Sequence, residues 1–190
     1  MNITEQFTVT QPIAEVWTLF HDVAELARCL PGAELTSDNG DGTYDGRVSV
    51  KLGPISASFE GAATVSFDDS THTVKIKGRG VDRSGGSQGQ VVVDVRMVET
   101  GSGVTDVTID AKVTLAGPIA QFGRTGLVNE VSRRLIDDFS TCLHAKLDAK
   151  SAEDAAQITA SEVHGLTLFL SSTWSAFVGW IRSHVSRSGE

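Results

Sequence analysis

The feature of this sequence that most constrains its fold is a long run of alternating apolar and polar residues, from about residue 44 to residue 115. The apolar residues keep one parity in five successive segments, which turn-forming residues such as Gly85-Gly86 and Gly101-Ser102-Gly103 separate. A period of two is typical of strands, and short turns join antiparallel neighbours. Because one parity is apolar and the other is largely polar, we predict an antiparallel sheet with one packed face and one solvated face.

Other elements flank this run on both sides. Residues Ile3 to Val9 form one more alternating strand, Pro12 then opens a short helix, and a second short helix lies around Val23 to Cys29. After Gly117-Pro118 the apolar residues recur every three or four positions, which predicts one helix of about 30 residues that begins there. We therefore expect an α+β fold in which a curved antiparallel sheet wraps around the long C-terminal helix.

Composition excludes several classes of function. The formal net charge of −8, with no cluster of Lys and Arg, argues against a nucleic-acid-binding surface. The two cysteines, Cys29 and Cys142, are far apart and lack metal-ligand spacing, so we expect buried free thiols, no disulfide and a reducing compartment. The first residues lack the basic and apolar regions of a secretory signal, so we expect the protein on the cytoplasmic side.

No recognisable catalytic or metal-binding constellation is present in the sequence. His21, His72 and His144 are scattered and have no Ser or Cys partner in a known motif. The glycines between Gly78 and Gly89 are not followed by the Gly-Lys-Ser/Thr of a phosphate-binding loop. We therefore expect a protein that is not an enzyme, with no catalytic residues and no metal.

The end of the chain has a different composition. Residues 163–181 contain no Asp, Glu, Lys or Arg and are followed by Arg182. On a helical wheel most of their larger apolar side chains, with Leu168 and Val178 as exceptions, share an arc of about 140°, which is typical of an amphipathic helix in a membrane interface. A helix of this length measures roughly 28 Å, just short of a bilayer core, so a span stays open, as does docking on this domain or on a partner. The predicted membrane-binding residues are Leu166, Phe169, Leu170, Trp174, Phe177, Trp180, Ile181 and Arg182.

Residues 149–163, rich in Ala, Ser and acidic side chains, are interpreted as a linker or a frayed extension of the long helix. The predicted organisation is thus a domain at 1–148, a linker at 149–163 and an amphipathic tail at 164–190.

Within the domain, small residues such as Gly46, Gly61 and Ala63 are frequent on the apolar parity. They are what room for a ligand requires, and equally what strand bends require.

Several short motifs, spread in order over the domain, resemble one family. They are Leu30-Pro31-Gly32-Ala33-Glu34, Tyr44-Asp45-Gly46, Val50-Lys51-Leu52-Gly53-Pro54-Ile55 and Gly117-Pro118-Ile119-Ala120-Gln121-Phe122-Gly123. On these motifs the domain resembles the carbon monoxide dehydrogenase G-subunit family, within the START-like (SRPBCC, helix-grip) superfamily. The resemblance implies a deep apolar cavity between the sheet and the long helix. It also implies the aerobic molybdenum–copper carbon monoxide dehydrogenase as a partner, and the tail is similar to a membrane-associating extension of some members.

From this resemblance we predict a non-enzymatic carrier of a prenylated respiratory quinone, menaquinone or ubiquinone. It would attach peripherally to the inner face of the cell membrane and present the quinone to the dehydrogenase as electron acceptor. The predicted lining residues are Tyr44, Val48, Val50, Phe59, Ala63, Val65, Ile76, Val91, Val93, Ile109, Ala111, Ile119, Phe122, Gly123 and Leu127. Tyr44, Gln121 and Arg124 are candidates to bond the quinone head group. Two alternatives stay open: a membrane tether for the dehydrogenase without a ligand, and a maturation factor for it, which the lack of Cys/His clusters disfavours.

Overall fold

The computed structural model describes residues 1–52, 55–101, 103–124, 127–149 and 152–160, so the predicted tail and all its membrane-binding residues lie outside the described part. The elements are β1 (Asn2–Val9), α1 (Ile13–His21), α2 (Val23–Arg28), β2 (Ala33–Asp38), β3 (Thr43–Leu52), β4 (Ile55–Asp68), β5 (Thr73–Asp82), β6 (Ser87–Gly101), β7 (Val104–Ala116), the 3-10 helix η1 (Pro118–Arg124), α3 (Leu127–Asp148) and α4 (Ala152–Gln157).

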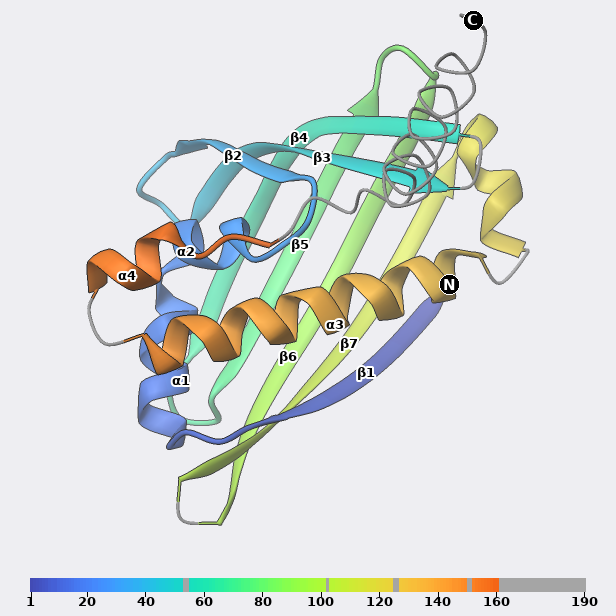
Figure 1. The fold of residues 1–190 in the computed structure, drawn as a ribbon. Coiled ribbons are helices and arrows are strands. Elements are labelled where there is room, and N and C mark those ends of the chain that lie inside the picture. Colours follow the sequence, from blue (N-terminus) through green and yellow to red (C-terminus); the bar gives the residue numbers. More distant parts are fainter. Residues whose placement is uncertain (53–54, 102, 125–126, 150–151, 161–190) are drawn as a thin grey trace, which may run out of the picture.

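The strands form one seven-stranded antiparallel sheet in the order β1-β7-β6-β5-β4-β3-β2. The sheet is curved, and α3 crosses its concave side (Figure 1). The pair α1 and α2 lies at one end of this side, beside the C-terminal end of α3, and η1 lies at the other end (Figure 1). The predicted α+β helix-grip architecture is therefore confirmed.

The register places one parity of every long strand on the concave side, which we call the inner face. Val95 of β6 pairs with Val74 of β5 and with Ile109 of β7, and all three are buried. Together with Val16 and Phe139 they belong to one buried cluster beneath the helices. The alternation in the sequence thus predicted correctly which side chains point inward.

A row of four glycines crosses the inner face. Gly46 of β3 pairs with Gly61 of β4, Gly61 with Gly80 of β5, and Gly80 with Gly89 of β6. A Cβ on Gly61 would stand 1.9 Å from the Arg79 carbonyl oxygen, so the backbones approach each other too closely for any side chain. Glycines at such positions let a sheet bend. Along this row β3 and β4 curve strongly (Figure 1).

The long helix begins later than the sequence predicts. Residues 118–124 form η1, and α3 begins at Leu127, so the apolar period after Gly117 covers two elements rather than one helix of about 30 residues. Gly123 and Gly126 fall within this stretch, and each glycine costs an α-helix roughly 1 kcal/mol relative to Ala. The backbone N–H of Ile119 donates to Ser87 Oγ at 3.3 Å, which fixes η1 to the start of β6.

The expectation of two free thiols is wrong. Cys29, at the end of α2, and Cys142, within α3, form a disulfide with their Cα atoms 5.4 Å apart. Both residues are buried. The argument from the cysteines for a reducing compartment therefore no longer holds.

The described part of residues 149–163 is packed against the domain and is not a free linker. Buried Lys146 donates from Nζ to Glu25 Oε2 at 2.6 Å and to the Ala155 carbonyl at 2.7 Å, so it joins α3 to α2 and α4. Arg28 donates from its guanidinium to the Ala156 carbonyl at 2.9 Å. These cations satisfy carbonyls of the last turn of α4, where the helix dipole favours positive charge. Ile158 packs against the main buried cluster.

Candidate ligand-binding face

The structure brings the predicted lining residues of the strands together on the inner face. Tyr44 pairs with Ala63, Val48 with Phe59, and Val50 with Ala57. Further along the sheet Val65 pairs with Ile76, Ile76 with Val93, and Val93 with Ala111. The helical predictions fall on η1 and at the start of α3, but the side chains of Phe122, Gly123, Arg124 and Leu127 lie outside the description.

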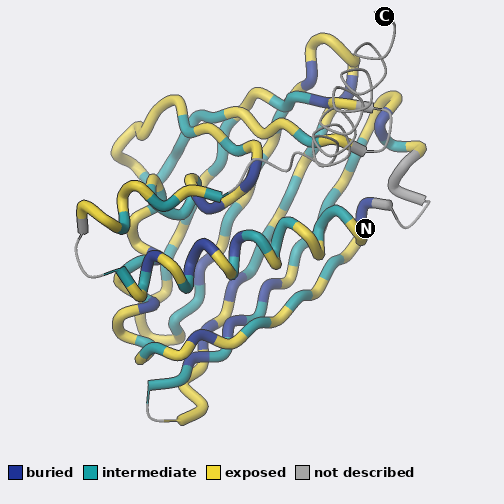
Figure 2. Tube along the Cα trace, in the orientation of Figure 1, coloured by how far each residue is buried: buried dark blue, intermediate teal, exposed yellow. Residues whose placement is uncertain are grey.

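The inner face has a closed half next to α1 and the C-terminal end of α3. There Ile109 is buried in the main cluster, and Val65, Ile76 and Val93 pack against that cluster. The buried residues gather in this half (Figure 2). Of these four predicted lining residues, Ile109 is therefore part of the core, and Val65, Ile76 and Val93 are partly buried against it.

The other half of the inner face is only partly covered, and we call it the open half. Its centre is a small cluster in which Ala57 and Ile119 are buried, with Val50, Phe59, Leu115 and Val131 packed around them and partly exposed. At its rim Val48 keeps 44% of its surface exposed. An apolar surface that a folded domain leaves uncovered is a common mark of a binding site.

Sequence reasoning missed several residues of the open half. Leu115 follows the inward parity of β7, and Val131 lies on the apolar stripe of α3, so both carried a readable signal. Leu30, which keeps 39% of its surface exposed between α2 and β2, carried no periodic signal, because it lies in a connection.

The glycine row serves backbone geometry more than ligand room. A Cβ on Gly46 would stand 2.7 Å from the Glu34 carbonyl oxygen, so at Gly46, as at Gly61, neighbouring backbone fills the space. A Cβ on Gly80 would stand 3.0 Å from Phe59 Cβ, and one on Gly89 3.5 Å from the Phe59 ring. The aromatic ring of Phe59 thus lies over Gly89, and the Cβ and backbone of Phe59 fill the space at Gly80. The sequence left ligand room and strand bends open as explanations, and at these four positions the bend and the ring account for the glycines.

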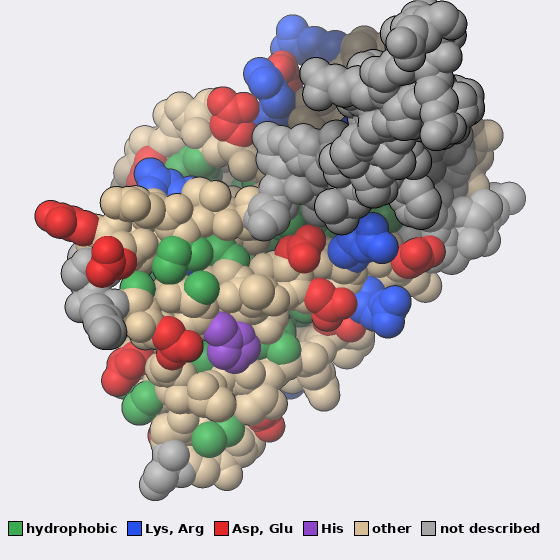
Figure 3. Space-filling view, in the orientation of Figure 1, with side chains coloured by type: hydrophobic (Ala, Val, Ile, Leu, Met, Phe, Trp, Pro, Cys, Tyr) green, Lys and Arg blue, Asp and Glu red, His purple; other side chains and the backbone are tan. Residues whose placement is uncertain are grey.

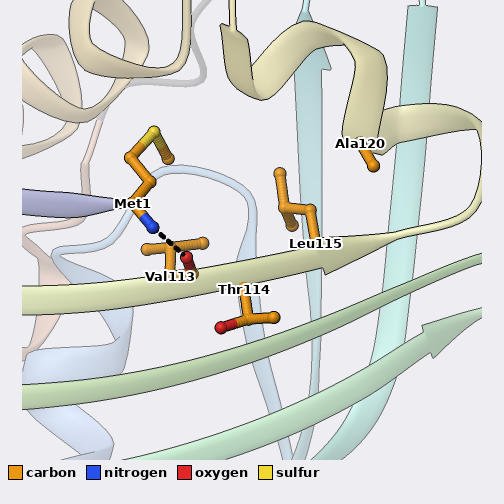
Figure 4. A pocket seen from close by; sticks show the side chains of 5 residues that line it. All are labelled: Met1, Val113, Thr114, Leu115 and Ala120. Carbon is orange, nitrogen blue, oxygen red and sulfur yellow. Dashed lines mark hydrogen bonds between the residues drawn. The ribbon is translucent and has the colours of Figure 1, made fainter.

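A small hollow lies where β1, β7 and η1 meet (Figure 4). It has a volume of about 230 Å³ and is lined by Met1, Val113, Thr114, Leu115 and Ala120. The Met1 amino group donates to the Val113 carbonyl at 2.9 Å and fixes the N-terminus at its edge. None of the predicted lining residues contributes to it, and it is smaller than the roughly 300–1,000 Å³ typical of ligand pockets.

A second hollow of about 350 Å³ lies at the α1–α2 end, between Thr18, His21, Asp22, Val23, Ala24, Asp38 and Tyr44. Desolvation, and then the carboxylates of Asp38 and Asp22, raise the pKa of the Tyr44 hydroxyl above its ordinary value. This hydroxyl is therefore a hydrogen-bond donor at neutral pH.

The predicted head-group trio is not brought together. Tyr44 pairs with Ala63, whereas Ile119 of η1 packs on Ala57, six residues away along β4, or about 20 Å along an extended strand. Gln121, two residues beyond Ile119, is exposed. Tyr44 and η1 thus belong to opposite ends of the inner face, so they cannot bond one head group together.

The histidines do not form a catalytic group. His21 stacks on Phe67 with ring centroids 4.2 Å apart, and its Nε2 lies 3.3 Å from Asp69 Oδ1. Trp17 donates from its indole to the same Asp69 oxygen at 2.9 Å, and its ring meets that of His72 edge to face at 5.2 Å. These contacts fasten α1 to the β4–β5 turn, and no nucleophile is bonded to either histidine among the described residues.

Charge and metal ligands give no further site within the described ranges. No group of three or more His, Cys, Asp or Glu side chains there could hold a metal ion. Acidic and basic side chains are interspersed on the visible face, with no continuous basic surface (Figure 3). Of the helices that the structure describes, none is long and apolar enough to cross a bilayer.

A family model described as the G-subunit of carbon monoxide dehydrogenase (CoxG) matches residues 6–148, which is most of the chain. The chain belongs to the CoxG family. The match ends at the last residue of α3, so it covers the sheet, η1 and the helix that grips the inner face. No curated protein matches the sequence.

Solved structures share the fold of this CoxG family member. A conserved protein from Geobacillus kaustophilus has a TM-score of 0.68 at 17% identity and covers 77% of this chain and 95% of its own. A START superfamily protein from Mycobacterium smegmatis has a TM-score of 0.53 at 12% identity, covering 77% and 97%. Norcoclaurine synthase from Thalictrum flavum has a TM-score of 0.52 at 18% identity, covering 80% and 88%. At these identities the likeness concerns the fold alone, which includes enzymes as well as other proteins.

Proposed function

We propose that this protein is a non-enzymatic carrier of a prenylated respiratory quinone, which it holds on the open half of the inner face. The observation that carries this proposal is the partly exposed apolar surface around Ala57 and Ile119 in a domain of the CoxG family. A folded domain in water gains stability by covering such a surface. A prenyl chain offers the apolar area to cover it, and family membership supplies the physiological context.

The energetics of an apolar site suit a carrier. Each CH₂ group removed from water contributes about 0.8 kcal/mol, so a prenyl chain does not cross an aqueous phase unaided. Lipid tails are as apolar as Leu side chains, so transfer from a bilayer to Val50, Phe59 and Leu115 changes the free energy little. A carrier needs this balance, because it must both load and release its cargo.

The proposed partner rests on the family, and the proposed location rests on the composition of the tail. CoxG is named for carbon monoxide dehydrogenase, and we propose the aerobic molybdenum–copper enzyme as the protein to which the quinone is delivered as electron acceptor. The amphipathic composition of residues 163–181 supports attachment to the inner face of the cell membrane. Whether the quinone is menaquinone or ubiquinone depends on the host membrane.

The experiment is mass spectrometry of a lipid extract from the purified full-length protein, together with retention of added menaquinone and ubiquinone. We expect a prenylated quinone at a fixed stoichiometry. Val50→Phe places a ring on the open half itself, beside Ala57, and should lower retention at least tenfold, with the melting temperature within a few degrees. Val92→Phe is the matched control, because Val92 is 36% exposed and pairs with Lys77 and Lys112 on the opposite parity.

A protein that neither co-purifies with quinone nor retains added quinone would refute the carrier proposal. Binding of that same preparation to the dehydrogenase and to membranes would then favour a recruitment tether without a ligand. A large fall in the melting temperature of Val50→Phe would instead place Val50 in a close-packed core.

A further inference from the structure

The open half of the inner face needs a cover in water, and the described chain ends beside it. The backbone N–H of Ala160 donates to the Arg28 carbonyl at 2.9 Å. Four residues after Arg28, the Gly32 carbonyl accepts from the Ser49 N–H at 2.8 Å. Ser49 lies between Val48 and Val50 in β3, so four residues, at most about 14 Å of chain, separate this exit from the open half.

Exposed apolar residues lie on both sides of the contact between Gly32 and Ser49. Leu30, two residues after Arg28, and Val48 are among the most exposed large apolar residues of the described chain. Glu34 pairs with Arg47 on the opposite, solvated parity, where Arg47 also meets Glu60 at 3.1 Å. The rim itself therefore presents apolar side chains, and the neighbouring charges are already paired on the other side of β3.

The sequence that follows the exit matches this surface in character and length. After Ala160 come two polar residues and then the uncharged segment 163–181, with its arc of Leu, Phe and Trp side chains. As a helix the segment would be roughly 28 Å long, enough to reach across several strands spaced about 4.8 Å apart. An uncharged amphipathic segment can cover an uncharged apolar face without burying an unpaired charge.

We propose that residues 163–181 of the same chain dock on the open half whenever the protein is not on a membrane. The bilayer and the open half then compete for one apolar segment. The docking itself does not require a ligand, so it stands or falls independently of the proposed function.

The experiment is photo-crosslinking of the full-length protein with p-benzoylphenylalanine in place of Val48, and separately in place of Leu30. Both positions are exposed, so one of them can report even if the other variant does not fold. The same replacement at Val92 on the solvated face is the control. Without lipid, crosslinks from positions 48 and 30 should map to residues 163–181 within one chain, at least fivefold above those from position 92. Vesicles containing phosphatidylglycerol should lower them at least fivefold.

Crosslinks between two chains would overturn the proposal and assign the open half to a second copy. Folded variants without crosslinks to 163–181, or with crosslinks that vesicles do not change, would also overturn it. Quinone retention, measured on the same preparations, separates this inference from the carrier proposal. Intramolecular crosslinks in a protein that never retains quinone would support the docking and refute the carrier, and quinone retention without the crosslinks would do the reverse.

Discussion

Replacing Gly61 by Ala tests the bend of the sheet at its tightest point. A Cβ there would stand 1.9 Å from the Arg79 carbonyl oxygen and 2.7 Å from Gly80 Cα. Real Cβ atoms do not approach other atoms closer than about 3 Å, so β4 and β5 must separate by roughly 1 Å. Both obstacles are backbone atoms that hydrogen bonds between the strands hold in place, and no rotamer change relieves the contact.

The cost should therefore lie at the upper end of what overpacking produces, about 3 kcal/mol. For a domain of this size 1 kcal/mol corresponds to roughly 2–4 °C, so the melting temperature should fall by about 6–12 °C. The matched control is Gly89→Ala in the same glycine row. Its Cβ would meet the Phe59 ring at 3.5 Å, an ordinary van der Waals contact. This control should change stability by less than about 1 kcal/mol, because Ala also loses less conformational entropy on folding than Gly.

The measurement is urea unfolding at 25 °C, followed by circular dichroism, with thermal melts of the same samples. Equal stabilities for Gly61→Ala and Gly89→Ala would refute the close approach of β4 and β5 at Gly61. They would also remove the argument that this glycine serves the bend rather than a ligand.

Three further predictions concern other parts of the molecule. Replacing Cys29 and Cys142 by Ala should lower the free energy of unfolding by about 2–5 kcal/mol, because their bond closes a loop with a sequence separation of 113 residues. A wild-type melting temperature that reductant leaves unchanged would contradict this prediction. A chain cut after Ala160 should stay folded and no longer sediment with vesicles. A cut after Lys150 should in addition lower the free energy of unfolding by roughly 1–3 kcal/mol, since it removes the α4 carbonyl that buried Lys146 binds. Equal melting temperatures for the two truncated chains would argue against the docking of α4 on Lys146. The Gly85 N–H and the Ser84 hydroxyl hold the pKa of Asp82 below its ordinary value of 3.8, so the contribution of Asp82 to stability is present above that pH and is lost as the pH falls through the lowered pKa. Asp82→Asn should therefore flatten the pH dependence of the melting temperature below about pH 4. An unchanged dependence in acid would count against this prediction.

The inner face could be predicted from the sequence because its cause is local. Successive side chains of a strand point to opposite sides, so apolar parity identifies the inward set without any knowledge of pairing. The closed and open halves could not be predicted, because coverage depends on where helices from elsewhere in the chain land. Ile109 and Leu115 share one strand and one parity, yet Ile109 is buried in the main cluster and Leu115 is only partly covered.

The misjudged features depend on tertiary proximity. Cys29 and Cys142 are 113 residues apart in sequence, and only the docking of α2 on α3 brings them together. The apolar period continued through Ile119 into α3, so periodicity alone could not separate η1 from the helix that follows. Likewise Ala155 and Ala156 carry no side-chain signal, and their carbonyls bind Lys146 and Arg28 only in the folded chain.

Phe59 links the bend of the sheet to the open half. Its ring lies over Gly89, its Cβ stands above Gly80, and it packs beside Ala57 and Ile119. Because Gly89 carries no side chain, the ring can lie low on the sheet, and a side chain much larger than Ala at position 89 would displace it. Its partner Val48 stands at the exposed rim, so an apolar chain that enters past Val48 would next meet the Phe59 ring. The glycines thus have two physical effects, close backbone packing at Gly46, Gly61 and Gly80 and a seat for an aromatic ring at Gly89, and only the second shapes the surface that a ligand would contact.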